Sequence, residues 1–201
     1  MGRIKLKGQP IPQFSNMSAF AEYQLVHQNA CVIVPDAAIT PAGATRVTLE
    51  LAGDASTSGL WPHAFVFQLE FLVAETLTIR LSATNRSAET APFAFAFHTY
   101  FAVPDVAQAR VSGLEDTDYI DKMDAGARKR QAGEVTIGAA TDRIHLDVPA
   151  RQTIESADGR IVIESDAGCA IVWNAWDNDR NIADMGEGNH VGYLCVERGE
   201  V

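Results

Sequence analysis

Apolar and polar residues alternate with a period of two along most of the chain after residue 44. Such alternation is typical of β-strands that bury one face and expose the other. The runs that show it are Thr45–Leu51, Ala64–Val73, Leu77–Thr84, Phe93–Val103, Glu134–Ile137, Ile144–Val148, Thr153–Glu155, Arg160–Glu164, Ala170–Asn174 and Gly192–Glu197. Asp158-Gly159, between two of these runs, predicts a β-hairpin. No long segment has the apolar stripe of a helix, so we predict an all-β fold with two antiparallel layers.

The first 44 residues follow a different pattern. They mix Pro, Gln, Ser and Asn with short apolar pieces. We therefore expect an irregular arm or edge segment over residues 1–44, followed by one β-sandwich domain over residues 45–201. A chain of 201 residues is long enough to bury a core without disulfides or metal ions.

Charge and composition exclude several classes of protein. The formal net charge is -10, from 26 acidic and 16 basic residues, and such a surface repels nucleic-acid phosphates. No uncharged apolar run reaches the roughly 18 residues of a membrane-spanning helix, so no membrane partner is expected. The three cysteines lack metal-ligand spacing, and the N-terminus lacks the apolar core of a signal peptide. We expect a cytoplasmic protein.

The run Pro92–Val103 is the strongest indication of a site. In an extended strand, bulky residues share one face, whereas the other face carries Ala94, Ala96, His98 and Tyr100. The bulky face suits a core, and the small residues beside His98 leave room for a ligand. From these residues alone, His98 is either a hydrogen-bonded structural histidine or a group that acts on a ligand.

Several short motifs then occur in a fixed order. They are Trp61-Pro62-His63, His98-Thr99-Tyr100-Phe101, Val111-Ser112-Gly113-Leu114, Tyr119-Ile120-Asp121, Thr141-Asp142-Arg143, Val172-Trp173-Asn174-Ala175-Trp176, Asp184-Met185-Gly186 and Cys195-Val196-Glu197. Each motif is weak alone, but the ordered set resembles the aldose 1-epimerase superfamily. Within it, the set is most similar to the hexose-6-phosphate mutarotase branch, the glucose-6-phosphate 1-epimerases. The resemblance extends over roughly residues 47–197.

The resemblance implies a fold, a reaction and roles for three residues. The fold is a galactose-mutarotase-like antiparallel β-supersandwich, with the substrate on the concave face of its larger sheet. The reaction interconverts the α and β anomers of an aldohexose or its 6-phosphate, so the partner is a small sugar or sugar phosphate. By resemblance, His98 is the acid, Glu197 is the base, and Asp142 hydrogen-bonds sugar hydroxyls.

Apart from the resemblance, the opening of a sugar ring itself requires an acid and a base. Opening a pyranose takes a proton from the anomeric hydroxyl and gives one to the ring oxygen, and closure reverses both transfers. We expect the two groups on opposite sides of the ring, with no metal or cofactor required. Glu197 shares a strand face with Tyr193 and Cys195, away from the apolar Leu194 and Val196. The alternative is that Glu197 is an exposed carboxylate at a strand end.

Other candidates are less specific. Tyr100 lies on the predicted face of His98, and we assign it to the substrate. Asp142 is either a sugar ligand or a turn residue before a strand. Trp173 and Trp176 flank Asn174; they pack in the core or one stacks on a sugar, and we assign Trp176 to the substrate. The remaining histidines lack the spacing typical of a metal site; these are His27, His63, His145 and His190.

The chain departs from the family pattern at both flanks. The Arg-Gly-Gly and His-Gly-Phe motifs of the family's N-terminal section are absent, and the chain ends four residues after Glu197. We therefore expect an incomplete supersandwich whose open sheet edges favour a homo-oligomer. A non-catalytic carbohydrate-binding or assembly protein derived from this fold is the alternative function.

Overall fold

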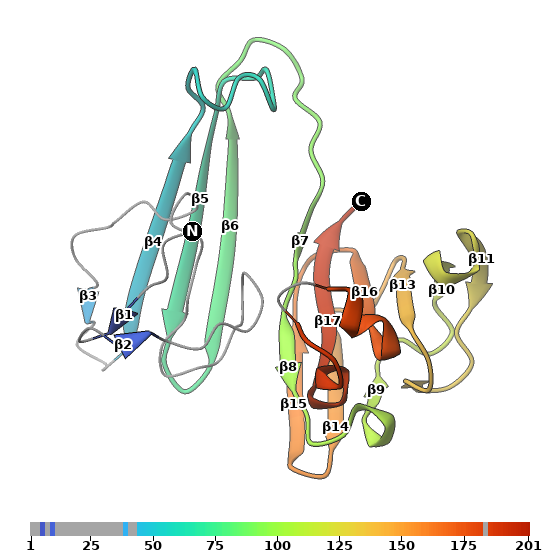
Figure 1. The fold of residues 1–201 in the computed structure, drawn as a ribbon. Helices are drawn as coiled ribbons and strands as arrows, with labels where there is room; N and C mark the ends of the chain where they lie inside the picture. The colour runs from blue at the N-terminus through green and yellow to red at the C-terminus, as the bar shows by residue number, and fades with distance from the viewer. Residues whose placement is uncertain (1–4, 7–8, 11–37, 40–43, 183–184) are drawn as a thin grey trace. The chain divides into compact units, whose positions relative to one another are not determined.

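The computed structural model describes residues 5–6, 9–10, 38–39, 44–182 and 185–201. Contacts divide the chain into two compact units, with the division after Phe93. One unit contains residues 94–201 together with the N-terminal residues up to 25, and the other spans residues 26–93. Each unit has its own sheets (Figure 1).

The C-terminal unit carries two antiparallel sheets. The larger has the order β11-β10-β13-β16-β17-β7, with β8 also paired to β17. Its strands are β7 (Phe95–Phe97), β8 (Tyr100–Ala102), β10 (Asp118–Asp121), β11 (Ala127–Arg130), β13 (Thr141–His145), β16 (Cys169–Asn174) and β17 (Tyr193–Glu200). The smaller has the order β12-β9-β14-β15, from β9 (Arg110–Ser112), β12 (Val135–Thr136), β14 (Arg151–Ser156) and β15 (Gly159–Glu164).

The apolar core lies between these two sheets. Val111 and Ile154 contribute from the smaller sheet, and Val172, Leu194 and Val196 contribute from the larger. All five side chains are almost completely inaccessible to solvent. One face of each sheet therefore meets the other, which is the sandwich that the period-two pattern predicted.

The other unit is built on one antiparallel sheet of order β3-β4-β5-β6. Its strands are β3 (Ala38–Ile39), β4 (Thr45–Ala52), β5 (Phe65–Val73) and β6 (Leu77–Asn85). Rings of Trp61, Phe65, Phe67 and Phe93 contact one another, with centroids 4.7–6.4 Å apart. Two further short strands, β1 (Lys5–Leu6) and β2 (Gln9–Pro10), pair with each other and are grouped with residues 94–201, not with this unit.

Most of the predicted strands are confirmed, and the hairpin is too. Ser156 pairs with Gly159, so Ala157-Asp158 form a two-residue loop between β14 and β15. The prediction of one continuous strand over Phe93–Val103 is wrong, because β7 and β8 are separate. The sequence pattern also missed β9, β10 and β11, which are short and carry many charged residues.

The predicted domain limits remain a prediction. Most of the arm over residues 1–44 lies outside the described residues, as do His27, Cys31 and Asp184. The contacts introduce a division inside the predicted domain of residues 45–201, since β4–β6 belong to a different unit from β7–β17. Among the described residues, no helix has the length and apolar composition needed to cross a membrane.

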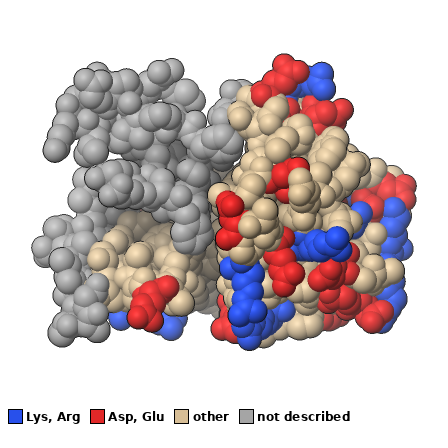
Figure 2. Space-filling model, turned by 90° about the horizontal axis from the view of Figure 1, so that it is seen from below, with Lys and Arg blue, Asp and Glu red and all other residues tan. Residues whose placement is uncertain are grey.

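Acidic and basic side chains are interspersed on the face turned to the viewer in Figure 2. Ion pairs join such side chains in the C-terminal unit, for example Arg128 with Asp118 at 3.3 Å and Lys129 with Asp124 at 2.8 Å. Some of the acidic side chains are therefore neutralised locally by neighbouring cations.

Candidate active site

Successive residues of β17 point to opposite faces of the sheet, one toward the core and the other toward the candidate site. Leu194 and Val196 belong to the core between the sheets. Tyr193 and Cys195 belong to a second buried cluster, on the other side of the strand. Glu197 follows the alternation of Tyr193 and Cys195, as predicted, but its side chain is only 7% exposed. Glu197 is therefore a buried carboxylate, so the alternative of an exposed strand-end group is wrong.

His98 lies where the edge strand is interrupted. Phe97 pairs with Arg198 and Tyr100 pairs with Cys195, so His98 and Thr99 face the stretch of β17 that contains Glu197. The Thr99 amide donates to the Phe97 carbonyl at 2.9 Å, a tight turn that takes His98 out of the extended conformation. The interruption thus presents the imidazole to the carboxylate.

The two side chains are in direct contact. His98 Nδ1 is 3.1 Å from Glu197 Oε1, although the geometry is not that of a hydrogen bond. The His98 side chain is 41% exposed, so the pair is reached from solvent through the imidazole. We expected the two groups on opposite sides of a sugar ring. They instead lie side by side, because adjacent strands carry them.

Aromatic rings surround the imidazole. Tyr100 stacks on His98 with a centroid distance of 4.8 Å and an interplanar angle of 4°. Trp173 meets the same imidazole edge-on at 5.5 Å. Tyr193 in turn contacts both Tyr100 and Trp173. The rings hold the imidazole plane in one orientation and exclude water from one side of it.

Asp142 lies on β13, where it pairs with Trp173 of β16. Directly opposed residues share a sheet face, so Asp142 is on the same face as Trp173 and not in a turn. Lys122 Nζ is 3.9 Å from Asp142 Oδ2, and the two side chains are 56% and 23% exposed. Asp142 and Lys122 therefore place one negative and one positive charge near the buried pair.

Burial and these charges change the proton affinities of the pair. Burial and, to a smaller extent, the charge of Asp142 raise the pKa of Glu197 to about 7, against the opposing charge of Lys122. Burial also lowers the pKa of His98, against the opposite effect of Asp142. Desolvation penalises the charged form of each group, which explains the opposite directions. Burial therefore shifts the pKa values of the two groups in opposite directions.

Trp176 has different neighbours from Trp173. It begins the 3₁₀-helix Trp176–Asn181, packs against the core, and has its ring 5.1 Å from that of His190. Its backbone has a positive φ of 52°, and its amide donates to Asn174 Oδ1 at 2.9 Å. The tryptophan ring in contact with His98 is thus that of Trp173, whereas the sequence led us to assign Trp176 to the substrate.

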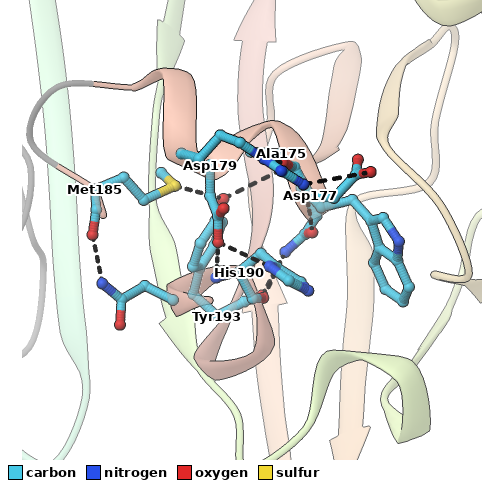
Figure 3. Close-up of polar contacts among 10 residues, drawn as sticks. Ala175, Asp177, Asp179, Met185, His190 and Tyr193 are labelled. Atoms are coloured by element: carbon cyan, nitrogen blue, oxygen red, sulfur yellow. Dashed lines mark hydrogen bonds and ion pairs between the residues drawn. The ribbon is translucent and has the colours of Figure 1, made fainter. Parts of the chain in front are cut away.

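A buried aspartate organises the segment after β16, and the sequence did not indicate it. The Asp179 carboxylate turns toward His190 in Figure 3, and its Oδ2 is 2.8 Å from His190 Nδ1. Nearby, the Tyr193 hydroxyl donates to the Met185 sulfur at 3.1 Å and accepts from the Ala175 amide. Burial raises the pKa of Asp179, but the hydrogen bonds from His190 outweigh this and hold it below its usual value. These contacts support the cluster that backs Cys195 and Trp173.

This chain is similar to known proteins both in sequence and in fold. The family described as aldose 1-epimerase matches residues 22–201. A Cenchrus ciliaris protein, named as a glucose-6-phosphate 1-epimerase, is 31% identical over 172 residues, which are 81% of this chain and 52% of that protein. A Salmonella typhimurium protein of the same name is 33% identical over 75% of this chain and 51% of its own length.

Solved structures agree. A structure described as a mutarotase from Salmonella typhimurium has a TM-score of 0.72 at 28% identity, and covers 79% of this chain and 54% of that one. A galactose mutarotase-like protein from Lactobacillus casei has a TM-score of 0.59 at 16% identity over 77% of this chain and 57% of that one, a likeness of fold alone. The predicted galactose-mutarotase-like all-β fold is confirmed. The chain spans about half the length of the curated relatives it matches, and it belongs to the aldose 1-epimerase family.

Proposed function

We propose that this chain interconverts the α and β anomers of an aldohexose 6-phosphate, with His98 as acid and Glu197 as base. The observation that carries the proposal is the contact of His98 Nδ1 with the buried Glu197 Oε1 at 3.1 Å. The phosphate rests on the relatives named as glucose-6-phosphate 1-epimerases, and an unphosphorylated aldohexose is the other candidate substrate.

A side-by-side pair suits this reaction. The anomeric hydroxyl and the ring oxygen are bonded to the same carbon, so neighbouring groups reach both from one side. Glu197 takes the proton of the hydroxyl while His98 protonates the ring oxygen, and the C1–O5 bond breaks. Rotation about C1–C2 exposes the other carbonyl face, and ring closure returns both protons. Each positioned group contributes roughly 10²–10⁴-fold to such a rate.

The substrate would lie on the sheet face that carries Asp142 and Trp173. We propose that Asp142 accepts hydrogen bonds from sugar hydroxyls, since it is partly exposed and on the face of the pair. Tyr100 contributes by holding the imidazole plane through its stacking. For Trp176, a direct substrate contact stays a prediction, whereas the Trp173 ring contacts that of His98.

Exchange NMR with purified α-glucose 6-phosphate tests the proposal directly. Wild-type protein should speed anomer exchange over the buffer rate, and Glu197→Gln should lower kcat by roughly 10²–10⁴-fold. His98→Asn should have a loss of similar size. Glu164→Gln is the matched control, because Glu164 is on β15 of the other sheet and its side chain is 69% exposed.

Two outcomes would contradict the proposal. Exchange by wild type no faster than by the Glu197→Gln, His98→Asn double variant would exclude catalysis by the pair. Sugar binding in calorimetry without any exchange would favour the alternative, a carbohydrate-binding protein. Parallel runs with glucose and glucose 6-phosphate decide whether the phosphate matters.

Cytoplasmic location and assembly into a homo-oligomer belong to the same proposal. The free thiols of Cys169 and Cys195 suit a reducing compartment such as the cytoplasm. The edge strand β15, which pairs only with β14 among the described strands, suits assembly. Light scattering on the whole chain measures the assembly, and a stable monomer would contradict it.

A further inference from the structure

Three potential metal ligands meet on the sheet face of the candidate site. Cys195 and Glu197 are two positions apart on β17 and share a face, and His98 lies opposite them at the β7–β8 interruption. One ligand atom from each residue lies within 4.8 Å of those of the other two. The sequence did not indicate this group, because His98 is far from the other two residues along the chain.

The donor atoms are a sulfur, an imidazole nitrogen and a carboxylate oxygen. Zn²⁺ binds all three types at about 2.0–2.3 Å, and three protein ligands leave its fourth position open. A thiolate disfavours hard ions such as Mg²⁺ and Ca²⁺, which prefer oxygen ligands. The donor set therefore selects the Zn²⁺ class of ions.

A second observation concerns the imidazole. His98 Nδ1 is buried and has no hydrogen-bond partner, although it is directed at Glu197. Buried polar atoms in folded proteins normally have partners, so an unpaired nitrogen in a ligand cluster indicates a place for one. The charge of Asp142 acts on both His98 and Glu197 and favours a cation there, whereas Lys122 disfavours one.

We propose that His98, Cys195 and Glu197 form a binding site for Zn²⁺ or a similar soft divalent ion. As the ion binds, the Cys195 S–H bond breaks, a sulfur–metal bond forms and the proton goes to water. Binding therefore strengthens as the pH rises. The ion needs a modest closing of the three side chains, since tetrahedral ligands lie closer together than 4.8 Å.

The bound ion and the proposed reaction compete for the same two side chains. An ion that holds Glu197 and His98 removes the lone pairs that would exchange protons with a sugar. Zn²⁺ should then inhibit anomer exchange reversibly, and a chelator should restore it. This inhibition rests on the proposed function, whereas the binding itself does not.

Co²⁺ is the probe, because a cobalt–thiolate bond has a charge-transfer band in the near ultraviolet. Titration of the whole chain with Co²⁺ should produce this band, and Zn²⁺ should displace it. Cys195→Ala should abolish the band. Cys169→Ala is the matched control, since Cys169 is also a buried free cysteine but is not part of the cluster.

His98→Ala is a second test of the site in case Cys195→Ala fails to fold. The His98 side chain is partly exposed, so its truncation should disturb the fold less. It should weaken Co²⁺ binding by at least the roughly 10–100-fold that the loss of an outer-shell partner costs. A thiolate band that persists in Cys195→Ala, or no band in wild type, would overturn the site. Co²⁺ binding without anomer exchange would instead refute only the proposed function.

Discussion

Burial of the Glu197 carboxylate controls the proton chemistry of the candidate site. An ordinary glutamate is fully ionised at neutral pH, whereas the pKa of Glu197 is about 7. Burial lowers the pKa of the adjacent His98, so the usual gap, in which the pKa of a histidine lies well above that of a glutamate, is closed. Since the groups are in contact, they titrate as one coupled pair. The singly protonated pair includes the tautomer with ionised Glu197 and protonated His98, which is the form that the proposed acid and base roles need.

A bell-shaped pH profile of kcat/KM follows from this coupling. Below the lowered pKa of His98 the pair takes up a second proton and Glu197 cannot accept another, so the rate should fall. Above about 7 the pair loses its proton and cannot donate to the ring oxygen, so the rate should fall again. Stopped-flow polarimetry across pH measures the profile. A rate that keeps rising well above neutral pH would contradict the assignment of the acid.

The alkaline limb of that profile should respond to Lys122. The charge of Lys122 lowers the pKa of Glu197, so Lys122→Met should raise this pKa and move the alkaline limb to higher pH. Asp142→Asn should move it to lower pH, because the charge of Asp142 raises the same pKa. Lys129→Met is the control, since Lys129 pairs with Asp121 and Asp124. An unchanged limb in both site variants would show that Glu197 does not govern it.

At the scale of elements, the site depends on how closely β7 approaches β17. Gly199 of β17 pairs with Ala96 of β7, and a Cβ at Gly199 would collide with the Phe95 carbonyl. A glycine is therefore required at position 199 for the pairing that brings His98 beside Glu197. The interruption after Phe97 then turns the imidazole toward the carboxylate.

Gly199→Ala should accordingly displace β7. We expect a loss of about 1–3 kcal/mol in the free energy of unfolding, together with a lower kcat as His98 moves from Glu197. Urea titration and anomer exchange measure the two effects. Gly138→Ala is the control, because a Cβ at Gly138 meets nothing within 4 Å. A Gly199→Ala variant with wild-type stability would contradict the required close approach.

At the scale of the whole molecule, the two units differ in how much they bury. Among the described residues 44–93, only Ala44 and Phe65 are buried. The C-terminal unit has a continuous core that includes Val172, Leu194 and Val196. Apolar burial is the main stabilising contribution, so the sheet of β4–β6 should open more easily than β16 and β17.

Hydrogen exchange on the whole chain tests this difference. Amides of β5, although hydrogen-bonded on both sides, should exchange at least about ten-fold faster than those of β16 and β17, a difference of about 1.4 kcal/mol. Equal protection in the two units would mean that they open together as one cooperative unit.

The sequence by itself determined most of the strands and the family of this protein. A period of two is a local property, and the ordered motifs around His98 and Glu197 are readable from the chain alone. The contact of these two residues, 99 positions apart, was decided only by the tertiary structure, through the pairing of β7 and β8 with β17. The burial of Glu197, the neighbours that distinguish Trp173 from Trp176, and the position of Cys195 beside the pair likewise depend on long-range packing, which local patterns do not encode.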